Sequence, residues 1–258
     1  MNTSYTLMAI IVALGLFLAM LAFLEIGRRV GVRRLEVPGA RAGVGVVDGT
    51  VYALLALLIG FTFNGAAARF DSRRELLGQA TNSAGTVWQR IDLLPPELQP
   101  PIRLALRNYL DALITAYTAP SDRDHPFAQA VPVTRAQDDL WTKAVAVCIL
   151  PAGEKARMLL LPGLNELFGT VEKERLARAV HPPWIVFAML ALAALAGALF
   201  VGYALANANR RNWLYMVGVA ATIASATYVI VELEYPRLGL IRIDSADRTL
   251  IQLRDSMR

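Results

Sequence analysis

Four long stretches without a charged side chain constrain this chain more than any other feature. They cover residues 1–24, 49–68, 182–209 and 212–231. A helix of about 20 apolar residues crosses the hydrocarbon core of a bilayer. Because lipid offers no hydrogen bonds to the backbone, each stretch must satisfy its own peptide groups, as a helix does. The pattern therefore predicts four transmembrane helices, in a chain that is 55% hydrophobic and only 18% charged.

A cleaved signal peptide is the alternative interpretation of the first stretch. Signal peptides begin with a basic region and continue with an apolar core of about 7–15 residues. Residues 1–5 contain no Lys or Arg, and the apolar run that follows is longer than such a core. These features favour a membrane helix that stays in the chain.

The region between the second and third stretches differs in composition and predicts a helical domain outside the membrane. Residues 69–181 hold 14 Lys or Arg and 13 Asp or Glu, and show no alternating strand pattern. The predicted fold class is an all-α membrane protein with four transmembrane helices. We expect residues 1–68 to hold the first two helices and an Arg-rich connection, 69–181 the extramembrane domain, 182–233 the last two helices, and 234–258 a tail.

Helical patterns continue beyond the second stretch. No proline interrupts the sequence from Ala68 to Pro95, so the second helix is expected to continue outside the membrane, with Gly78 and Gly85 as weak points. Residues 97–118 carry apolar side chains at i, i+3 and i+4 spacing, which predicts an amphipathic helix.

The rest of the domain is expected to contain a loop and two further helices. A loop is predicted over 119–133, and Thr134 with Gln137 resembles a capping box that begins the next helix. Pro151 and Pro162 are expected to break or kink the helix that follows. The tail is expected to bend after the fourth span, run extended and end in a short helix that folds back along the domain.

The sequence contains no recognisable catalytic or metal-binding motif, so neither an enzyme nor a cofactor is expected. The single cysteine, Cys148, has apolar neighbours and is interpreted as a core residue. His125 and His181 are far apart and are interpreted as structural or solvated. Glu232 and Glu234 end the fourth span, where we expect a solvated flank. Ion binding is the alternative, because charge at membrane depth is costly and often functional.

Charge does not determine which side of the membrane the domain occupies. The net charge of +5 arises from two short connections, with Arg28, Arg29, Arg33, Arg34 and Arg41 in the first and Arg210 and Arg211 in the second. Lys and Arg favour the cytoplasmic side, but the opposite flanks carry eight such residues against these seven. A nucleic-acid partner is not expected, because no basic patch is interleaved with aromatic residues.

The second span has a face of possible functional importance. Ala53, Leu57 and Phe61 recur every four residues and therefore share one side of a helix, with the polar Asn64 one turn further on. Around a symmetry axis, such a face would form a hydrophobic constriction. Ordinary helix packing is the alternative, because every transmembrane helix must pack part of its surface.

Two segments resemble bestrophins. Ile59-Gly60-Phe61-Thr62-Phe63-Asn64, followed by Ala66-Ala67-Ala68-Arg69-Phe70, resembles the second bestrophin helix, which has a Leu-Gly-Phe-Tyr core. Glu234-Tyr235-Pro236-Arg237-Leu238-Gly239 is similar in place to the Asn-Pro-Phe-Gly motif of that family. The whole chain is more similar to the bacterial bestrophin-like family known as DUF4239, through LLIGFTFNGAAARFDSRREL, TVWQRIDLLP and RNYLDALITAY.

The resemblance implies a pentameric ion channel whose second helix lines the pore. It places the neck at Ala53, Leu57 and Phe61, with Asn64 also lining the pore. It also implies a homo-oligomer in the bacterial inner membrane with a cytoplasmic domain. The tail departs from the motif at Glu234 and Arg237, although Pro236 and Gly239 are kept. No acidic run follows, so a calcium clasp is not expected.

Two functional hypotheses remain open at this point. In the first, the chain forms an ion channel, and Arg69, Arg73 and Arg74 favour anions at the inner mouth of the pore. Simple interfacial anchoring is the alternative role of these arginines. In the second hypothesis, the chain is a non-conducting scaffold that binds a partner protein through the apolar stripe of residues 97–118.

Overall fold

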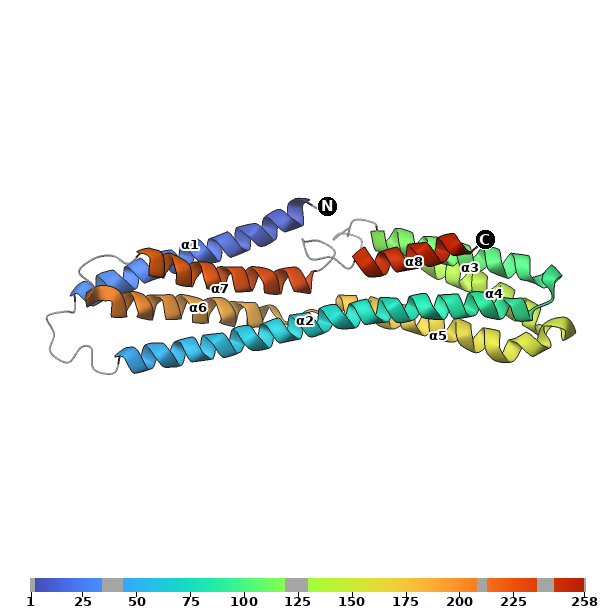
Figure 1. The fold of residues 1–258 in the computed structure, drawn as a ribbon, viewed down its shortest axis with the longest axis horizontal. Coiled ribbons are helices and arrows are strands. Elements are labelled where there is room, and N and C mark those ends of the chain that lie inside the picture. Colours follow the sequence, from blue (N-terminus) through green and yellow to red (C-terminus); the bar gives the residue numbers. More distant parts are fainter. Residues whose placement is uncertain (1–2, 34–43, 119–129, 208–212, 236–243, 258) are drawn as a thin grey trace. The chain divides into compact units, whose positions relative to one another are not determined.

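A computed structural model describes residues 3–33, 44–118, 130–207, 213–235 and 244–257 of the chain. These residues form helices and connecting turns and contain no strand, which confirms the all-α class (Figure 1). The α-helices are α1 (Thr3–Arg33), α2 (Val44–Arg90), α3 (Gln99–Thr118), α4 (Ala130–Ile149), α5 (Glu154–Ala179), α6 (Trp184–Ala204), α7 (Trp213–Glu234) and α8 (Asp244–Ser256). The short 3₁₀ helices are η1 (Ile91–Leu93), η2 (Pro96–Leu98), η3 (Pro151–Gly153) and η4 (Leu205–Asn207).

The four predicted transmembrane helices are confirmed as helices of sufficient length and apolarity. The candidate spans are Leu7–Arg33, Gly49–Leu93, Pro151–Ala204 and Trp213–Glu234, whose most apolar parts lie in α1, α2, α6 and α7. The continuation of the second helix beyond Ala68 is also confirmed, because α2 runs without interruption to Arg90. Gly78 and Gly85 do not break it, since a single glycine costs a helix only about 1 kcal/mol.

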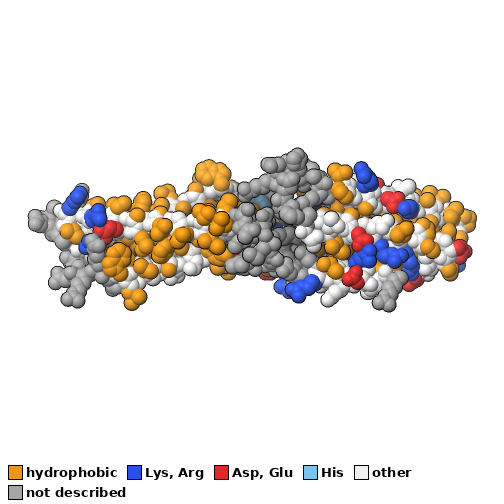
Figure 2. All heavy atoms as spheres, turned by 90° about the horizontal axis from the view of Figure 1, so that it is seen from above, with side chains coloured by type: hydrophobic (Ala, Val, Ile, Leu, Met, Phe, Trp, Pro, Cys, Tyr) orange, Lys and Arg blue, Asp and Glu red, His pale blue; other side chains and the backbone are white. Residues whose placement is uncertain are grey.

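The chain forms two compact units, each with its own core. The first comprises residues 1–70 and 181–242, and the second comprises residues 71–180 and 243–258. Hydrophobic side chains cover most of the visible surface of the first unit, whereas Lys, Arg, Asp and Glu gather over the second (Figure 2). This distribution suits a lipid-exposed unit and a water-exposed unit respectively.

Small residues bring α1 and α6 into close backbone contact in the first unit. A Cβ atom at Gly27 would lie 2.0 Å from the carbonyl oxygen of Leu199, and one at Gly202 would lie 2.0 Å from that of Leu24. Only glycine fits at these two positions. Such contacts suit membrane helices, which gain little from apolar burial against lipid and associate through close packing.

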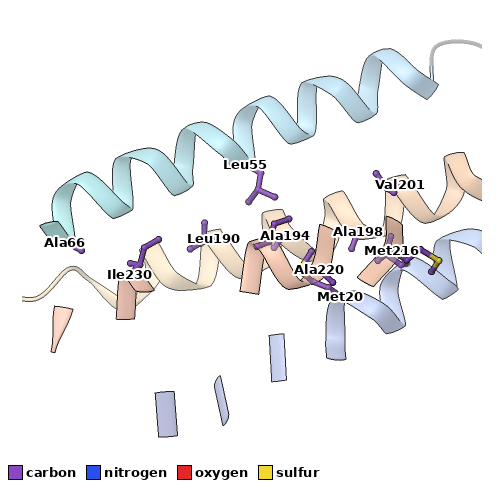
Figure 3. Close-up of a cluster of buried hydrophobic side chains, with 12 residues drawn as sticks. Met20, Leu55, Ala66, Leu190, Ala194, Ala198, Val201, Met216, Ala220 and Ile230 are labelled. Carbon is purple, nitrogen blue, oxygen red and sulfur yellow. The ribbon is translucent and has the colours of Figure 1, made fainter. Parts of the chain in front are cut away.

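The core of the first unit joins all four membrane helices (Figure 3). From α2, Leu55 points toward the small and branched side chains of α6 and α7. The buried set is Met20, Leu24, Leu55, Ala66, Leu190, Ala194, Ala198, Val201, Met216, Ala220, Ile223 and Ile230. Helix α2 thus contributes to the core through a single face.

The predicted amphipathic helix is confirmed as α3, and it supplies the core of the second unit. Its apolar stripe is buried against α4, α5 and α8, with Ile102, Leu106, Tyr109 and Leu110 fully enclosed. Tyr109 packs edge-to-face on Phe168 of α5 with ring centroids 5.3 Å apart. The stripe is therefore not accessible to a partner protein, which removes the surface on which the scaffold hypothesis relied.

Two boundaries in the second unit differ from the sequence-based expectation. Helix α4 begins at Ala130, so the predicted loop end at residue 133 and the capping box at Thr134 and Gln137 are wrong. Pro132 is tolerated in the first turn because the first N–H groups of a helix have no acceptor within it. Pro162 does not break α5, whereas Pro151 does interrupt the helical stretch, because η3 begins there between α4 and α5.

The side chain of Arg90 supports α5 close to its internal proline. Its Nη1 donates to the carbonyl oxygen of Leu159 at 2.9 Å, one turn before Pro162. The guanidinium lies against Gly163, where a Cβ atom would stand 2.6 Å from Nη1. This contact attaches the turn of α5 that precedes Pro162 to the end of α2.

The remaining expectations for the second unit agree with the structure. Cys148 is buried, and this burial raises the pKa of its thiol, as suits a core residue. The short helix of the tail is α8, which packs on α3. Arg254 of α8 donates to both carboxylate oxygens of Asp111, at 2.5 and 2.6 Å. The expected bend and extended segment, and His125, lie outside the described residues.

We predict that Gly27→Ala destabilises the first unit by about 1–3 kcal/mol, because its methyl group would overlap the Leu199 carbonyl. Thermal unfolding in detergent, followed by circular dichroism, measures the effect. Gly15→Ala in the same helix is the matched control, since a Cβ atom there meets nothing within 4 Å. Equal stability of the two variants would contradict the close α1–α6 contact.

Candidate functional site

Helix α2 has one face that is packed in its own unit and one face that is exposed there. Leu55 and Ala66 are buried on the packed face. On the other face, Leu57 is 53% exposed and Phe61 is 67% exposed, and Ala53 and Asn64 are exposed as well. Their spacing of four, four and three residues places these four side chains on one side of the helix. We call Ala53, Leu57, Phe61 and Asn64 the outer face of α2.

The membrane part of α2 is the least enclosed of the four spans. Only 11% of the residues in its most apolar stretch are buried, against 33% in the stretches that lie in α6 and α7. Close backbone packing among the described residues joins α1 to α6 and α7, whereas α2 is attached mainly through side chains. The subunit alone therefore leaves a broad apolar surface of α2 for lipid or for further copies of the chain.

The three arginines expected at an inner mouth have different environments. Arg69 is 29% exposed and pairs with Glu234 of α7. Arg73 is buried, and it donates to the carbonyl oxygens of Ala177 and Val180 at 3.0 Å each, where α5 ends. Arg74 is exposed. Of the three, Arg74 is the one whose side chain lies largely in solvent.

Glu234 is the centre of a buried polar cluster at the end of α7. Its side chain is 0% exposed, so the expectation of a solvated flank is wrong for Glu234, and it is wrong for the buried Glu232 too. Arg69 Nε lies 3.1 and 2.9 Å from the two carboxylate oxygens, and Arg69 Nη2 lies 2.9 Å from Oε2. Two donors on one carboxylate make this a strong, directional contact.

The imidazole of His181 completes the cluster. Its Nδ1 lies 3.2 Å from Glu234 Oε1, and its ring stacks on Tyr235 with centroids 4.7 Å apart. His181 lies just before α6, so the cluster connects α2, the start of α6 and the end of α7. We call Arg69, His181 and Glu234 the clamp.

The sequence contains a signal for the clamp that helical periodicity does not reveal. In a chain with four spans, the ends of the second and fourth helices lie on the same side of the membrane. An arginine and a glutamate at those two ends can therefore meet although 165 residues separate them. Because a buried charge requires a partner, opposite charges at matching helix ends are candidates for pairing.

Among the described residues, no group of three or more His, Cys, Asp or Glu side chains is arranged to hold a metal ion. Pro236 and Gly239 of the expected C-terminal motif lie outside the described residues, so Glu234 and Tyr235 are the part of that motif that the structure places.

Comparison with known protein families identifies this arrangement of helices. A sequence model of the Bestrophin-like domain matches residues 13–247, nearly the whole chain. The chain belongs to the bestrophin-like family. The match includes most of the first span, the other three spans and the inserted domain of this bestrophin-like protein. Comparison with curated proteins finds no match.

Solved structures show the same fold. Two crystal structures of mutant forms of a bacterial bestrophin homologue from Klebsiella pneumoniae match with a TM-score of 0.68 and 16% identity. The alignments cover 92% and 95% of this chain and 98% of each homologue chain. A crystal structure of a membrane protein matches with a TM-score of 0.69 and 17% identity, over 94% of this chain and 98% of that one. These matches confirm the bestrophin fold.

We predict that Arg69→Gln lowers the free energy of unfolding of this bestrophin-like protein by about 3 kcal/mol, because it leaves the buried Glu234 carboxylate without its main cation. Thermal unfolding in detergent measures the loss. Arg74→Gln removes the same charge from an exposed position five residues away and should change stability by no more than about 0.5 kcal/mol. A similar loss in both variants would contradict the buried ion pair.

Proposed function

We propose that this chain is a subunit of a homo-oligomeric ion channel in which α2 lines the pore. The observation that carries the proposal is the outer face of α2, which is mainly apolar and exposed in the subunit. Membership of the bestrophin-like family supports it, because bestrophins are ion channels. We further propose a pentamer in the bacterial inner membrane, with the second unit in the cytoplasm.

The outer face has the chemistry of a hydrophobic neck. Rings of Leu57 and Phe61 around a shared axis would form a narrow apolar passage, with the smaller Ala53 one turn before them and the polar Asn64 after them. Such a passage controls ion flow through its width and wetting, because a dry apolar constriction excludes hydrated ions. Phe61 is the one aromatic residue of this set, so we assign the narrowest ring to it.

Anions are the proposed permeant ions. Arg74 is exposed on α2 beyond the membrane stretch, where repeated copies would produce a positive potential near the inner mouth. Arg69 contributes less, because Glu234 neutralises it at close range. The proposed anion selectivity therefore depends on Arg74 and not on Arg69, which is paired with Glu234.

Reconstitution into liposomes tests the channel proposal. We expect Phe61→Ala to raise the rate of salt-driven ion flux severalfold, because it widens the proposed neck. Its thermal stability should change by less than the 3–5 kcal/mol typical of a buried Phe→Ala substitution, since Phe61 is 67% exposed in the subunit.

Leu192→Ala is the matched control for Phe61→Ala. Leu192 is 69% exposed on α6, so its substitution also removes apolar surface from a membrane helix, yet lies outside the proposed neck. Its flux should equal that of the wild-type protein. Absence of wild-type flux in both chloride and potassium gradients would overturn the channel proposal, and equal effects of the two variants would overturn the assignment of the neck to α2.

A further inference from the structure

The clamp lies directly beyond the proposed neck on the same helix. Arg69 follows Phe61 by eight residues, about two helical turns, and it is on the packed face of α2. Its partners are Glu234 at the end of α7 and, through that carboxylate, His181 before α6. The clamp therefore fixes the inner end of the membrane part of α2 to the two helices that pack against it.

Helix α2 is locally weakened around the neck residue Phe61, before the helix reaches the clamp. A Cβ atom at Gly60 would meet nothing within 4 Å, so no packing contact accounts for the glycine there. Thr62 Oγ1 donates to the carbonyl oxygens of Leu58 and Ile59 at 2.7 and 3.0 Å, a contact that tends to bend helices. Glycine also reduces helix stability. The segment from Gly60 to Gly65 is thus a weak point in the membrane part of α2.

Gly65 links this weak segment to the clamp. A Cβ atom at Gly65 would lie 3.3 Å from Arg69 Nη1, closer than ordinary side-chain contacts. The missing side chain leaves room for the guanidinium to lie against the helix while its Nε and Nη2 reach Glu234. Gly65 therefore makes room for the ion pair, although a glycine lowers the stability of the helix.

Stability alone is a weak reason for a buried ion pair at this position. Replacement of both partners of such a pair by apolar residues is often neutral or stabilising, whereas removal of one partner is harmful. An ion pair with two donors on one carboxylate fixes distance and direction more strictly than apolar contact does. The ion pair therefore fixes the alignment of α2, which an apolar contact would not do.

From these observations we propose that Arg69 and Glu234 are positioning residues that set the open probability of the channel, by fixing the inner end of α2 below its weak segment. This inference rests on the proposed channel function. The clamp adds little net charge to an ion path, because Glu234 is fully buried and neutralises Arg69 at close range. Loss of the pair should therefore change how often the pore is open and leave the current through each open pore unchanged.

Single-channel recording of the full-length protein in planar bilayers with symmetric KCl tests this inference. The informative variant is Arg69→Met combined with Glu234→Met, which removes both charges and leaves no buried carboxylate unpaired. It should remain folded with near wild-type thermal stability, while its open probability differs from the wild-type value by about tenfold or more and its unitary conductance is unchanged. A purely structural role predicts that this double variant restores wild-type gating.

Two further variants distinguish an effect on open probability from an effect on unitary conductance. Leu192→Ala, outside both the clamp and the neck, should keep the wild-type open probability, and Phe61→Ala should change unitary conductance. Wild-type open probability in the Arg69→Met/Glu234→Met variant would overturn the inference and leave the channel proposal intact. A changed unitary conductance in that variant would also overturn it. A silent wild-type protein would overturn the channel proposal itself, and the clamp inference with it.

Discussion

Hydrocarbon cannot form hydrogen bonds with a peptide group, and this constraint determines the organisation of the first unit. Each span must satisfy its own backbone, so α1, α2, α6 and α7 are continuous helices through their apolar stretches. Lipid competes well for apolar side chains, so the helices associate where small residues permit close approach. The Gly27 and Gly202 contacts between α1 and α6 are the direct result.

The same constraint distinguishes α2 from the other three spans. Polar and charged groups at membrane depth require partners, and Arg69 and Glu234 satisfy each other where α2 and α7 leave the apolar region. The packed face of α2 thus carries both its core residues and its ion pair. The outer face has no comparable partner within the unit, and its exposed phenylalanine and leucine are stable there only against lipid or other protein surfaces.

The sequence was sufficient for most of the local structure, because periodicity and the absence of proline are local signals. It predicted the extension of α2 past Ala68 and the amphipathic character of α3. Tertiary partners were harder to predict. The α3 stripe is covered by helices of its own unit, and Glu234 is buried by a partner 165 residues away. The first turn of α4 was missed because Pro132 was interpreted as a loop residue, although a proline there costs the helix nothing.

The central claim is that several copies of α2 surround a shared axis with their outer faces directed inward. Electron cryomicroscopy of the purified protein in lipid nanodiscs tests this most directly. The account predicts a closed ring of subunits in which Leu57 and Phe61 face the symmetry axis. A single subunit, or a ring in which those two side chains face lipid, would contradict it.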